Sequence, residues 1–161
     1  MRIPKAHLLA MAGLLLLVIA KYDDAAGFTP LIRFGETSKN PRLEVINHLP
    51  VAMIEGSNGY DGQFYAQVAL DPLLQQPALA GALDVPVYRA RRILMPATAA
   101  TLGLGQPWPT LQAFALINVA CWLALGWLLH ARLVNDDHGP ARWFGCMFAL
   151  GVLDSVRQSL V

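Results

Sequence analysis

The stretch "LQAFALINVACWLALGWLLHARL", Leu111 to Leu133, decides the fold class of this chain. It carries no charge up to Leu129, and its strongly polar side chains in that run are Gln112 and Asn118. In a helix that rises about 1.5 Å per residue, these 19 residues cover most of the roughly 30 Å hydrocarbon core of a bilayer. The stretch therefore predicts a transmembrane helix over residues 111–131.

Composition supports a membrane protein. Of the 161 residues, 55% are hydrophobic and 14% are charged, whereas about 25% are charged in a typical soluble domain. The net charge is +1 and no basic stripe stands out, so the sequence gives no case for nucleic-acid binding. Cys121 and Cys146 both lie in apolar runs without zinc-type spacing, so neither a disulfide framework nor a zinc site is expected.

A second apolar segment, residues 6–20, follows two basic residues near the N-terminus. It has 15 residues, which is short for a span that needs about twenty. The basic start, the Leu-rich centre and the pair Val18 and Ala20 also suit a secretory signal peptide. The residues alone leave both interpretations open, but residues 111–131 make a first transmembrane helix our expectation.

A third apolar segment, residues 143–161, begins like another span and stops where the chain stops. Asp154 and Arg157 in it share one helix face and are able to pair inside a bundle. We expect the start of a third, truncated transmembrane helix, and hence a chain that is a fragment of a longer protein. The expected fold class is mainly α, with two or three integral membrane helices and a long external loop that contains amphipathic helices.

Short basic flanks set the expected orientation. By the positive-inside rule, the ends of the spans that carry basic residues face the cytoplasm. These residues are Arg2, Lys5, Arg132 and Arg142. Residues 1–5 are then a cytoplasmic N-terminus and residues 132–142 a cytoplasmic loop, while residues 21–110 lie outside. In a bacterium, the chain would sit in the inner membrane with this long loop in the periplasm.

The external loop is expected to begin with two extended pieces, residues 28–35 and 45–54, and to continue with helices. "DGQFYAQVALDP" places Phe64 and Val68 on one stripe before a terminating proline, which predicts a helix over residues 61–71. Asp61 stands at its start, where an aspartate commonly caps the helix.

A second helix is expected over residues 87–104. Arg89 and Arg92 in it are three residues apart and share a face, while Arg91 points elsewhere. The apolar stretch after them suits the membrane interface, so the arginines would lie at the depth of lipid phosphates. Specific phosphate binding and ordinary snorkelling to headgroups both fit this pattern.

Two motifs carry a family resemblance. "GYDGQFYAQVALDPL", residues 59–73, and "DVPVYRARRILMPATAATLGLGQP", residues 84–107, are similar to the N-terminal part of bacterial multi-span proteins related to the GT-C glycosyltransferases. The resemblance covers residues 59–133. The family pattern has Tyr-Gln where this chain has Ala90-Arg91, and Tyr where it has Met95.

The resemblance implies a membrane enzyme that transfers a sugar from a polyprenyl-phosphate carrier to an acceptor in cell-surface glycan formation. Asp61 would be the catalytic base or a ligand of a divalent cation, although no second carboxylate stands at chelating spacing and no metal site is assigned. Arg89 and Arg92 would hold the carrier phosphate, and Tyr60 and Tyr65 would contact the substrate. The implied partners are the lipid bilayer and the lipid-linked sugar donor.

Two other protein classes fit the same residues. One is a small membrane protein that catalyses nothing and binds a lipid or a protein partner through its external loop. The other is an external domain that follows a cleaved signal peptide and ends in a C-terminal anchor.

Overall fold

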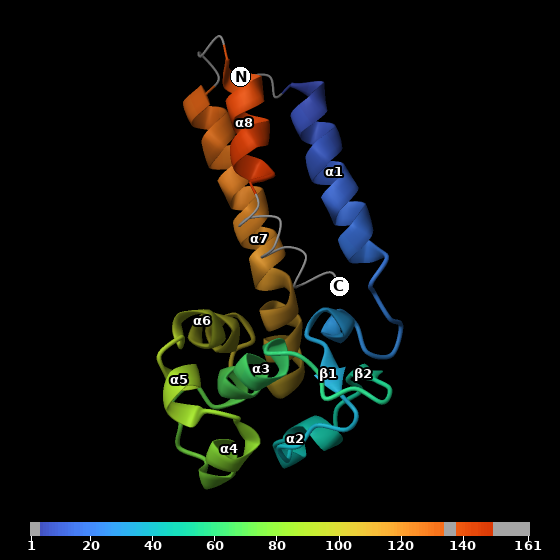
Figure 1. Cartoon of the computed structure of the whole chain (residues 1–161), viewed down its shortest axis with the longest axis vertical. Helices are drawn as coiled ribbons and strands as arrows, with labels where there is room; N and C mark the ends of the chain where they lie inside the picture. The colour runs from blue at the N-terminus through green and yellow to red at the C-terminus, as the bar shows by residue number, and fades with distance from the viewer. Residues whose placement is uncertain (1–3, 134–137, 150–161) are drawn as a thin grey trace. The chain divides into compact units, whose positions relative to one another are not determined.

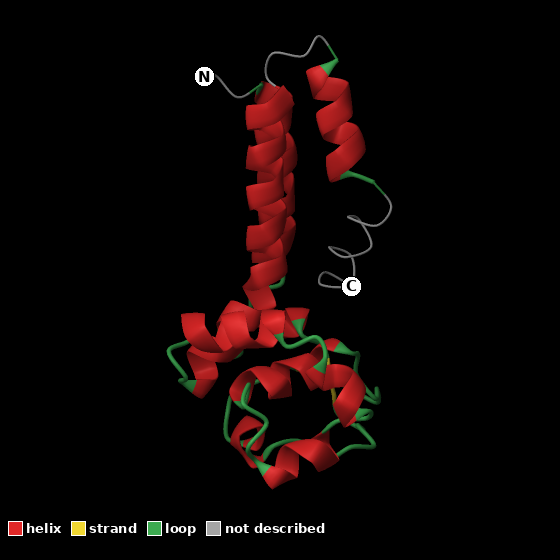
Figure 2. Ribbon diagram, turned by 90° about the vertical axis from the view of Figure 1, so that its left-hand side faces the viewer, coloured by secondary structure: helices red, strands yellow, loops and turns green. Residues whose placement is uncertain are grey.

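The computed structural model describes residues 4–133 and 138–149, and these residues are mainly helical, as the sequence predicts (Figure 2). The chain divides into two compact units. We call Tyr22–Ile117 the central unit, and Met1–Lys21 with Asn118–Val161 the terminal unit. The long helix α7, Pro107–Leu133, contributes residues to both units.

The terminal unit contains α1 (Lys5–Ile19), the later part of α7, and α8 (Gly139–Met147). The indole of Trp143 on α8 is fully buried and donates a hydrogen bond of 2.8 Å from Nε1 to the carbonyl oxygen of Gly126 on α7. A β-carbon on Gly126 would lie 3.4 Å from the Trp143 ring and 3.2 Å from Met147. The absence of a side chain at this glycine therefore lets α8 pack closely on α7.

The predicted helices at 6–20 and 111–131 are confirmed as helices. α7 starts earlier than predicted because Pro107 suits a first helical position, where its missing N–H leaves no hydrogen bond unmade. The expected 132–142 loop is too long, since α7 continues to Leu133 and α8 begins at Gly139. The expected third span extends into residues 150–161, and most of it, including Asp154 and Arg157, lies outside the described residues.

Length and composition single out α7 among the helices that the structure describes, because it is long and apolar enough to cross a membrane. Its 27 residues extend over about 40 Å. In its most apolar window of 18 residues, 33% are buried within the protein, whereas the core helix of a soluble protein is mostly buried. α1 is apolar but has 15 residues and falls short of the same length.

The central unit places short elements around α3, Gly62–Leu70 (Figure 1). In chain order the others are η1 (Thr29–Leu31), β1 (Phe34–Gly35), α2 (Glu44–Asn47), β2 (Met53–Ile54), α4 (Pro77–Ala82), α5 (Pro86–Ala90) and α6 (Leu94–Leu102). β1 and β2 pair in parallel, with Phe34 opposite Met53. The helix predicted at 61–71 is confirmed. The extended pieces predicted at 28–35 and 45–54 are wrong over much of their length, because η1 and part of α2 lie inside them and the strands are confined to their last two residues.

The single helix predicted over residues 87–104 is wrong. The chain instead forms α5 and α6, separated by a turn at residues 91–93. Pro96 explains the break, because its ring would clash with the carbonyl of Arg92 four residues earlier in a continuous helix. In α6, Pro96 lies in the first turn, where it is tolerated.

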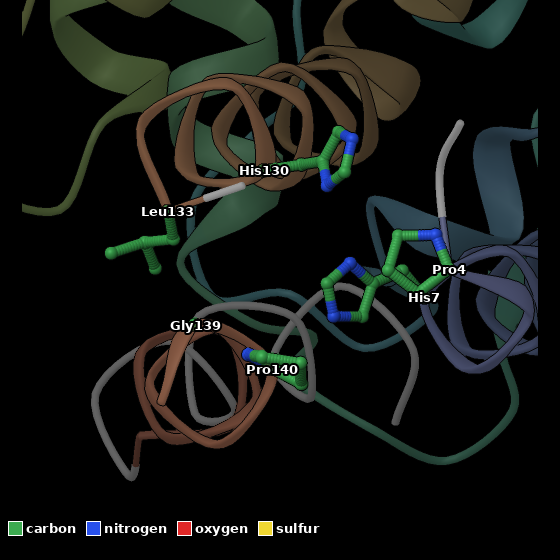
Figure 3. Close-up of a pocket in the computed structure, with 6 residues that line it drawn as sticks. All are labelled: Pro4, His7, His130, Leu133, Gly139 and Pro140. Carbon is green, nitrogen blue, oxygen red and sulfur yellow. The ribbon is translucent and has the colours of Figure 1, made fainter. Parts of the chain in front are cut away.

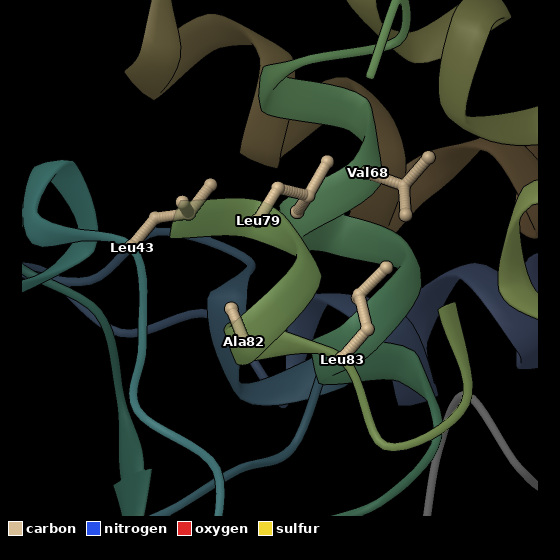
Figure 4. Close-up of a cluster of buried hydrophobic side chains, with 5 residues drawn as sticks. All are labelled: Leu43, Val68, Leu79, Ala82 and Leu83. Atoms are coloured by element: carbon tan, nitrogen blue, oxygen red, sulfur yellow. The ribbon is translucent and has the colours of Figure 1, made fainter. Parts of the chain in front are cut away.

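The core of the central unit is a cluster of aliphatic side chains between α3, α4 and the segment before α2 (Figure 4). Its members are Leu43, Val68, Leu79, Ala82 and Leu83, all of them buried. α3 also contacts α5, α6 and β1. Because α3 packs against several other elements, the backbone at its N-terminus, where Asp61 lies, is held in place.

Candidate functional site

An ion pair between Asp61 and Arg89 joins the start of α3 to α5. Arg89 donates two hydrogen bonds to the carboxylate, from Nη1 to Oδ2 at 2.9 Å and from Nη2 to Oδ1 at 3.0 Å. Such a two-bond pair fixes the plane of the carboxylate as well as its position. The Asp61 side chain nevertheless remains 73% exposed, so a held carboxylate faces the surroundings.

A second carboxylate completes the site. Asp84 accepts hydrogen bonds from Arg89 Nε at 2.8 Å and from Arg89 Nη2 at 2.7 Å. The Arg89 side chain is only 4% exposed, and its hydrogen bonds to Asp84 and Asp61 raise its pKa further above the ordinary arginine value. The hydrogen bond from Arg89 is also the main reason why the pKa of Asp84 lies below its ordinary value. Two carboxylates and one guanidinium leave one net negative charge.

Aromatic rings surround the guanidinium of Arg89. Its central carbon lies 4.9 Å from the ring centres of both Phe64 and Tyr65, and 5.5 Å from that of Tyr88. These distances are within the range of cation–π attraction. The rings shield the guanidinium from water, which strengthens its hydrogen bonds to Asp61 and Asp84.

Two glycines let the turn that carries Asp61 lie against the segment around β1. Gly59 has φ of +78°, and a β-carbon there would overlap the amide nitrogen of Gly35. A β-carbon on Gly62 would lie 2.7 Å from the carbonyl oxygen of Ile32. The Gly-Tyr-Asp-Gly motif is thus explained by close backbone contact on both sides of the aspartate.

Two buried glutamines on α3 hold the loops around the site. Gln63 Oε1 accepts a hydrogen bond of 3.2 Å from the Gly35 amide, and its Nε2 donates one of 2.8 Å to the Asn58 carbonyl. One helical turn later, Gln67 Oε1 accepts a hydrogen bond of 2.9 Å from the Leu43 amide. The two glutamine side chains thereby supply hydrogen bonds to backbone groups of the loops, which lack the regular partners of a helix or a sheet.

Asp61 is the N-cap residue of α3, as its position in the sequence predicts, but the capping hydrogen bond expected of its side chain is not formed. The φ and ψ of Asp61, −52° and −32°, are helical. Both carboxylate oxygens instead accept hydrogen bonds from Arg89. A guanidinium within reach outcompetes a backbone amide, because hydrogen bonds between charged partners are roughly twice as strong.

Arg89 and Arg92 do not form the expected common face. Arg89 is buried in the ion pair, whereas Arg92 follows the end of α5 and is exposed. The guanidinium of Arg92 lies 4.8 Å from the Tyr88 ring centre and makes no hydrogen bond or ion pair with another described residue. Its donors are therefore open to an external anion, unlike those of Arg89.

The two predicted substrate-contact tyrosines have different environments. Tyr60 is 52% exposed, and the guanidinium of Arg33 stacks on its ring at 3.8 Å. Tyr65 is half-buried, and its ring centre lies 4.9 Å from the guanidinium carbon of Arg89. Tyr60 is thus accessible to a ligand, and Tyr65 mainly packs the site.

Sequence reasoning missed Asp84, Arg33 and the glutamines. The only sequence signal for Asp84 is its position five residues before Arg89, directly ahead of a proline-initiated helix. Arg33 has an unusual left-handed backbone with φ of +66°, which the sequence does not reveal. No group of three or more histidine, cysteine or acidic side chains capable of holding a metal occurs among residues 4–133 and 138–149.

No family model, curated protein or solved structure matches this chain.

Proposed function

We propose that the central unit carries the acceptor site of a membrane glycosyltransferase of the GT-C type, with Asp61 as the general base. The observation behind this proposal is an exposed carboxylate held by two hydrogen bonds to a buried arginine, which is itself held by Asp84. Fixing a base before the substrate arrives avoids the entropic cost of orienting it during the reaction. Each carboxylate oxygen keeps a second lone pair for the acceptor.

In the proposed reaction, an acceptor hydroxyl donates its proton to Asp61 while its oxygen attacks the anomeric carbon of the sugar. The bond between that carbon and the carrier phosphate breaks, and its electron pair leaves with the polyprenyl phosphate. Inversion at the anomeric carbon follows from the single displacement. General base catalysis of this kind contributes about 10²–10⁴-fold to a rate.

The phosphate of the leaving carrier needs positive charge, and Arg92 supplies it in this scheme. Its guanidinium is exposed and makes no hydrogen bond with another described residue, so its fork of donors is open to a phosphate. Arg89 acts instead as a positioning residue, because Asp61 and Asp84 already accept its hydrogen bonds. Tyr60 lies next to Asp61 in the chain and offers an exposed ring to a sugar.

The proposed setting is the bacterial inner membrane, with α7 and α1 as spans and the central unit on the periplasmic side. This setting is supported by the apolar length of α7 and by its partial burial within the protein. α1 likewise exposes apolar side chains to its surroundings, among them Leu9, Leu16 and Leu17. α6 adds Leu94, which is 80% exposed, and Leu102, which is 64% exposed. Apolar groups this exposed fit contact with lipid.

The test is transfer of a labelled sugar from a polyprenyl phosphate by membranes that contain the chain, with Asp61→Asn as the key variant. The amide keeps the shape but loses the base, so transfer should fall by about 10²-fold or more. Asp24→Asn is the matched control, because Asp24 is an exposed aspartate of the same unit without a contact to the site. Full transfer by a folded Asp61→Asn variant would overturn the proposal.

One observation favours the non-catalytic alternative. The hydrogen bonds of the Arg89 side chain go to Asp61 and Asp84 of the same chain. The ion pair could therefore serve only to hold α3 against α5, without a part in catalysis. In that case the exposed leucines of α6 and the open arginine Arg92 would bind anionic lipid without chemistry. Asp61→Asn would then leave vesicle binding unchanged, and the wild-type chain would transfer no sugar.

A further inference from the structure

Two histidines of the terminal unit are buried without hydrogen-bond partners. His7 on α1 and His130 on α7 are each 3% exposed. Both ring nitrogens of His7 and Nε2 of His130 lack a partner among the described residues. A buried polar group without a partner costs about 1–3 kcal/mol. Three such nitrogens in one place indicate a ligand that supplies the missing interactions.

The two rings border one small cavity. It has a volume of about 50 Å³ and is lined by Pro4, His7, His130, Leu133, Gly139 and Pro140. Figure 3 shows the rings coming from different helices, with a nitrogen of each directed toward the other ring. The ring centres are 5.6 Å apart, and the planes are nearly perpendicular at 80°. A cavity needs roughly 10–15 Å³ to hold one water, so this cavity has room for an ion and a few waters.

We propose that His7 and His130 bind a divalent transition-metal ion of the zinc or cobalt type. Neutral imidazole is the commonest protein ligand for such ions. With metal–nitrogen bonds of about 2.1 Å, two rings on a tetrahedral ion have centres about 5.3 Å apart. The observed separation of 5.6 Å is close to that value. Two ligands are fewer than a typical protein zinc site supplies, so water completes the coordination sphere.

The His7 ring is already held in orientation. It stacks on Trp143 with ring centres 4.0 Å apart and planes 12° apart. Trp143 is in turn fixed by its hydrogen bond to Gly126. Side chains that orient a metal ligand raise the affinity of the site, because less freedom is lost on binding. The proposed metal would therefore link α1 to α7 through a His7 ring that is oriented before the metal binds.

The test is a titration of the purified full chain in detergent with Co²⁺, followed by the visible absorption of the four-coordinate ion. We expect one ion per chain, displaced by Zn²⁺, and a rise in the thermal midpoint as the ion binds. His7→Phe keeps a ring stacked on Trp143 but removes both nitrogens, and His130→Leu removes the second ligand. Each should weaken binding by about tenfold or more.

His48→Leu is the matched control, because the His48 side chain is 75% exposed and lies in the central unit. It should bind Co²⁺ as the wild type does. Equal binding by wild type, His7→Phe and His130→Leu would overturn the proposal. So would a wild-type chain that binds no metal and whose histidine pair only takes up a proton. Neither result depends on whether the central unit transfers sugar.

Discussion

Asp61 and Arg89 lie 28 residues apart in the sequence and are joined by hydrogen bonds of 2.9 and 3.0 Å. The arginine is buried and the aspartate is exposed. Because Arg89 belongs to α5, the position of α5 determines how the Asp61 carboxylate is oriented at the start of α3. The exposed side of the Asp61 carboxylate stays open to a ligand while Arg89 holds the other side.

Arg89→Lys should destabilise the central unit by about 1–3 kcal/mol. A lysine keeps the charge but is a point donor and lacks the fork that reaches both carboxylates. The cost stays moderate because both carboxylates remain partly hydrated. Chemical unfolding of the chain measures the change. Arg91→Lys is the control, since Arg91 is exposed and should change stability by less than about 0.5 kcal/mol. Equal effects of the two substitutions would contradict the role given to Arg89.

The central unit should lose stability in acid through Asp84. The hydrogen bond from Arg89 is the main cause that lowers the pKa of Asp84 from its ordinary value of 3.8. A carboxyl whose pKa is lower in the folded state adds stability above its unfolded pKa, and that stability is lost as the pH falls through the folded pKa. Thermal midpoints from about pH 6 to about pH 3 test this.

Asp84→Asn supplies the comparison for the acid titration. Its amide has no charge to lose, so the variant should start from a lower midpoint at neutral pH and fall less steeply in acid than the wild type. An acid decline as steep as that of the wild type would assign the effect to other carboxylates.

Gly59→Ala should destabilise the chain more than Gly56→Ala. Both glycines have left-handed backbones, with φ of +78° and +61°. A β-carbon on Gly56 meets nothing within 4 Å, whereas one on Gly59 overlaps Gly35 and Gln63. We expect a loss of about 1 kcal/mol for Gly56→Ala from the backbone alone, and of about 2 kcal/mol or more for Gly59→Ala. Equal losses in chemical unfolding would show that the close contact is not tight.

The sequence predicts those parts of the fold that depend on local patterns. A long uncharged run predicts α7, and an apolar stripe closed by Pro72 predicts α3. Pro96 carried the signal for the break between α5 and α6, but the apolar run around it obscured that signal. Helix existence follows from periodicity, whereas helix ends depend on single residues.

The candidate site follows from the sequence only in part. Asp61 and Arg89 are recognisable as chemistry-bearing residues, yet no spacing rule reveals that they bind each other across 28 residues. The sequence does not reveal the hydrogen bonds between Asp84 and Arg89, because they depend on the path that the backbone takes before α5. His7 and His130 are single histidines in apolar helices, and only their approach in space shows that they face one cavity.

Ala120→Asp tests whether α7 lies in lipid. Ala120 is exposed near the middle of α7. On the exposed face of a helix in water, the substitution should cost less than about 1 kcal/mol. At the centre of a membrane span, an aspartate costs about 2.5–3.5 kcal/mol, which is about a hundredfold in the insertion equilibrium. Alkaline extraction of membranes should therefore release Ala120→Asp and retain the wild type.

Ala131→Asp is the matched control for this measurement, because Ala131 is exposed near the C-terminal end of the same helix. An aspartate there reaches the interface, where the cost of a charge is small, so this variant should stay in the membrane. The contrast between the two positions separates lipid burial from a general effect of the new charge. A wild-type chain found in the soluble fraction would rule out the membrane setting, and with it the carrier lipid as the proposed sugar donor.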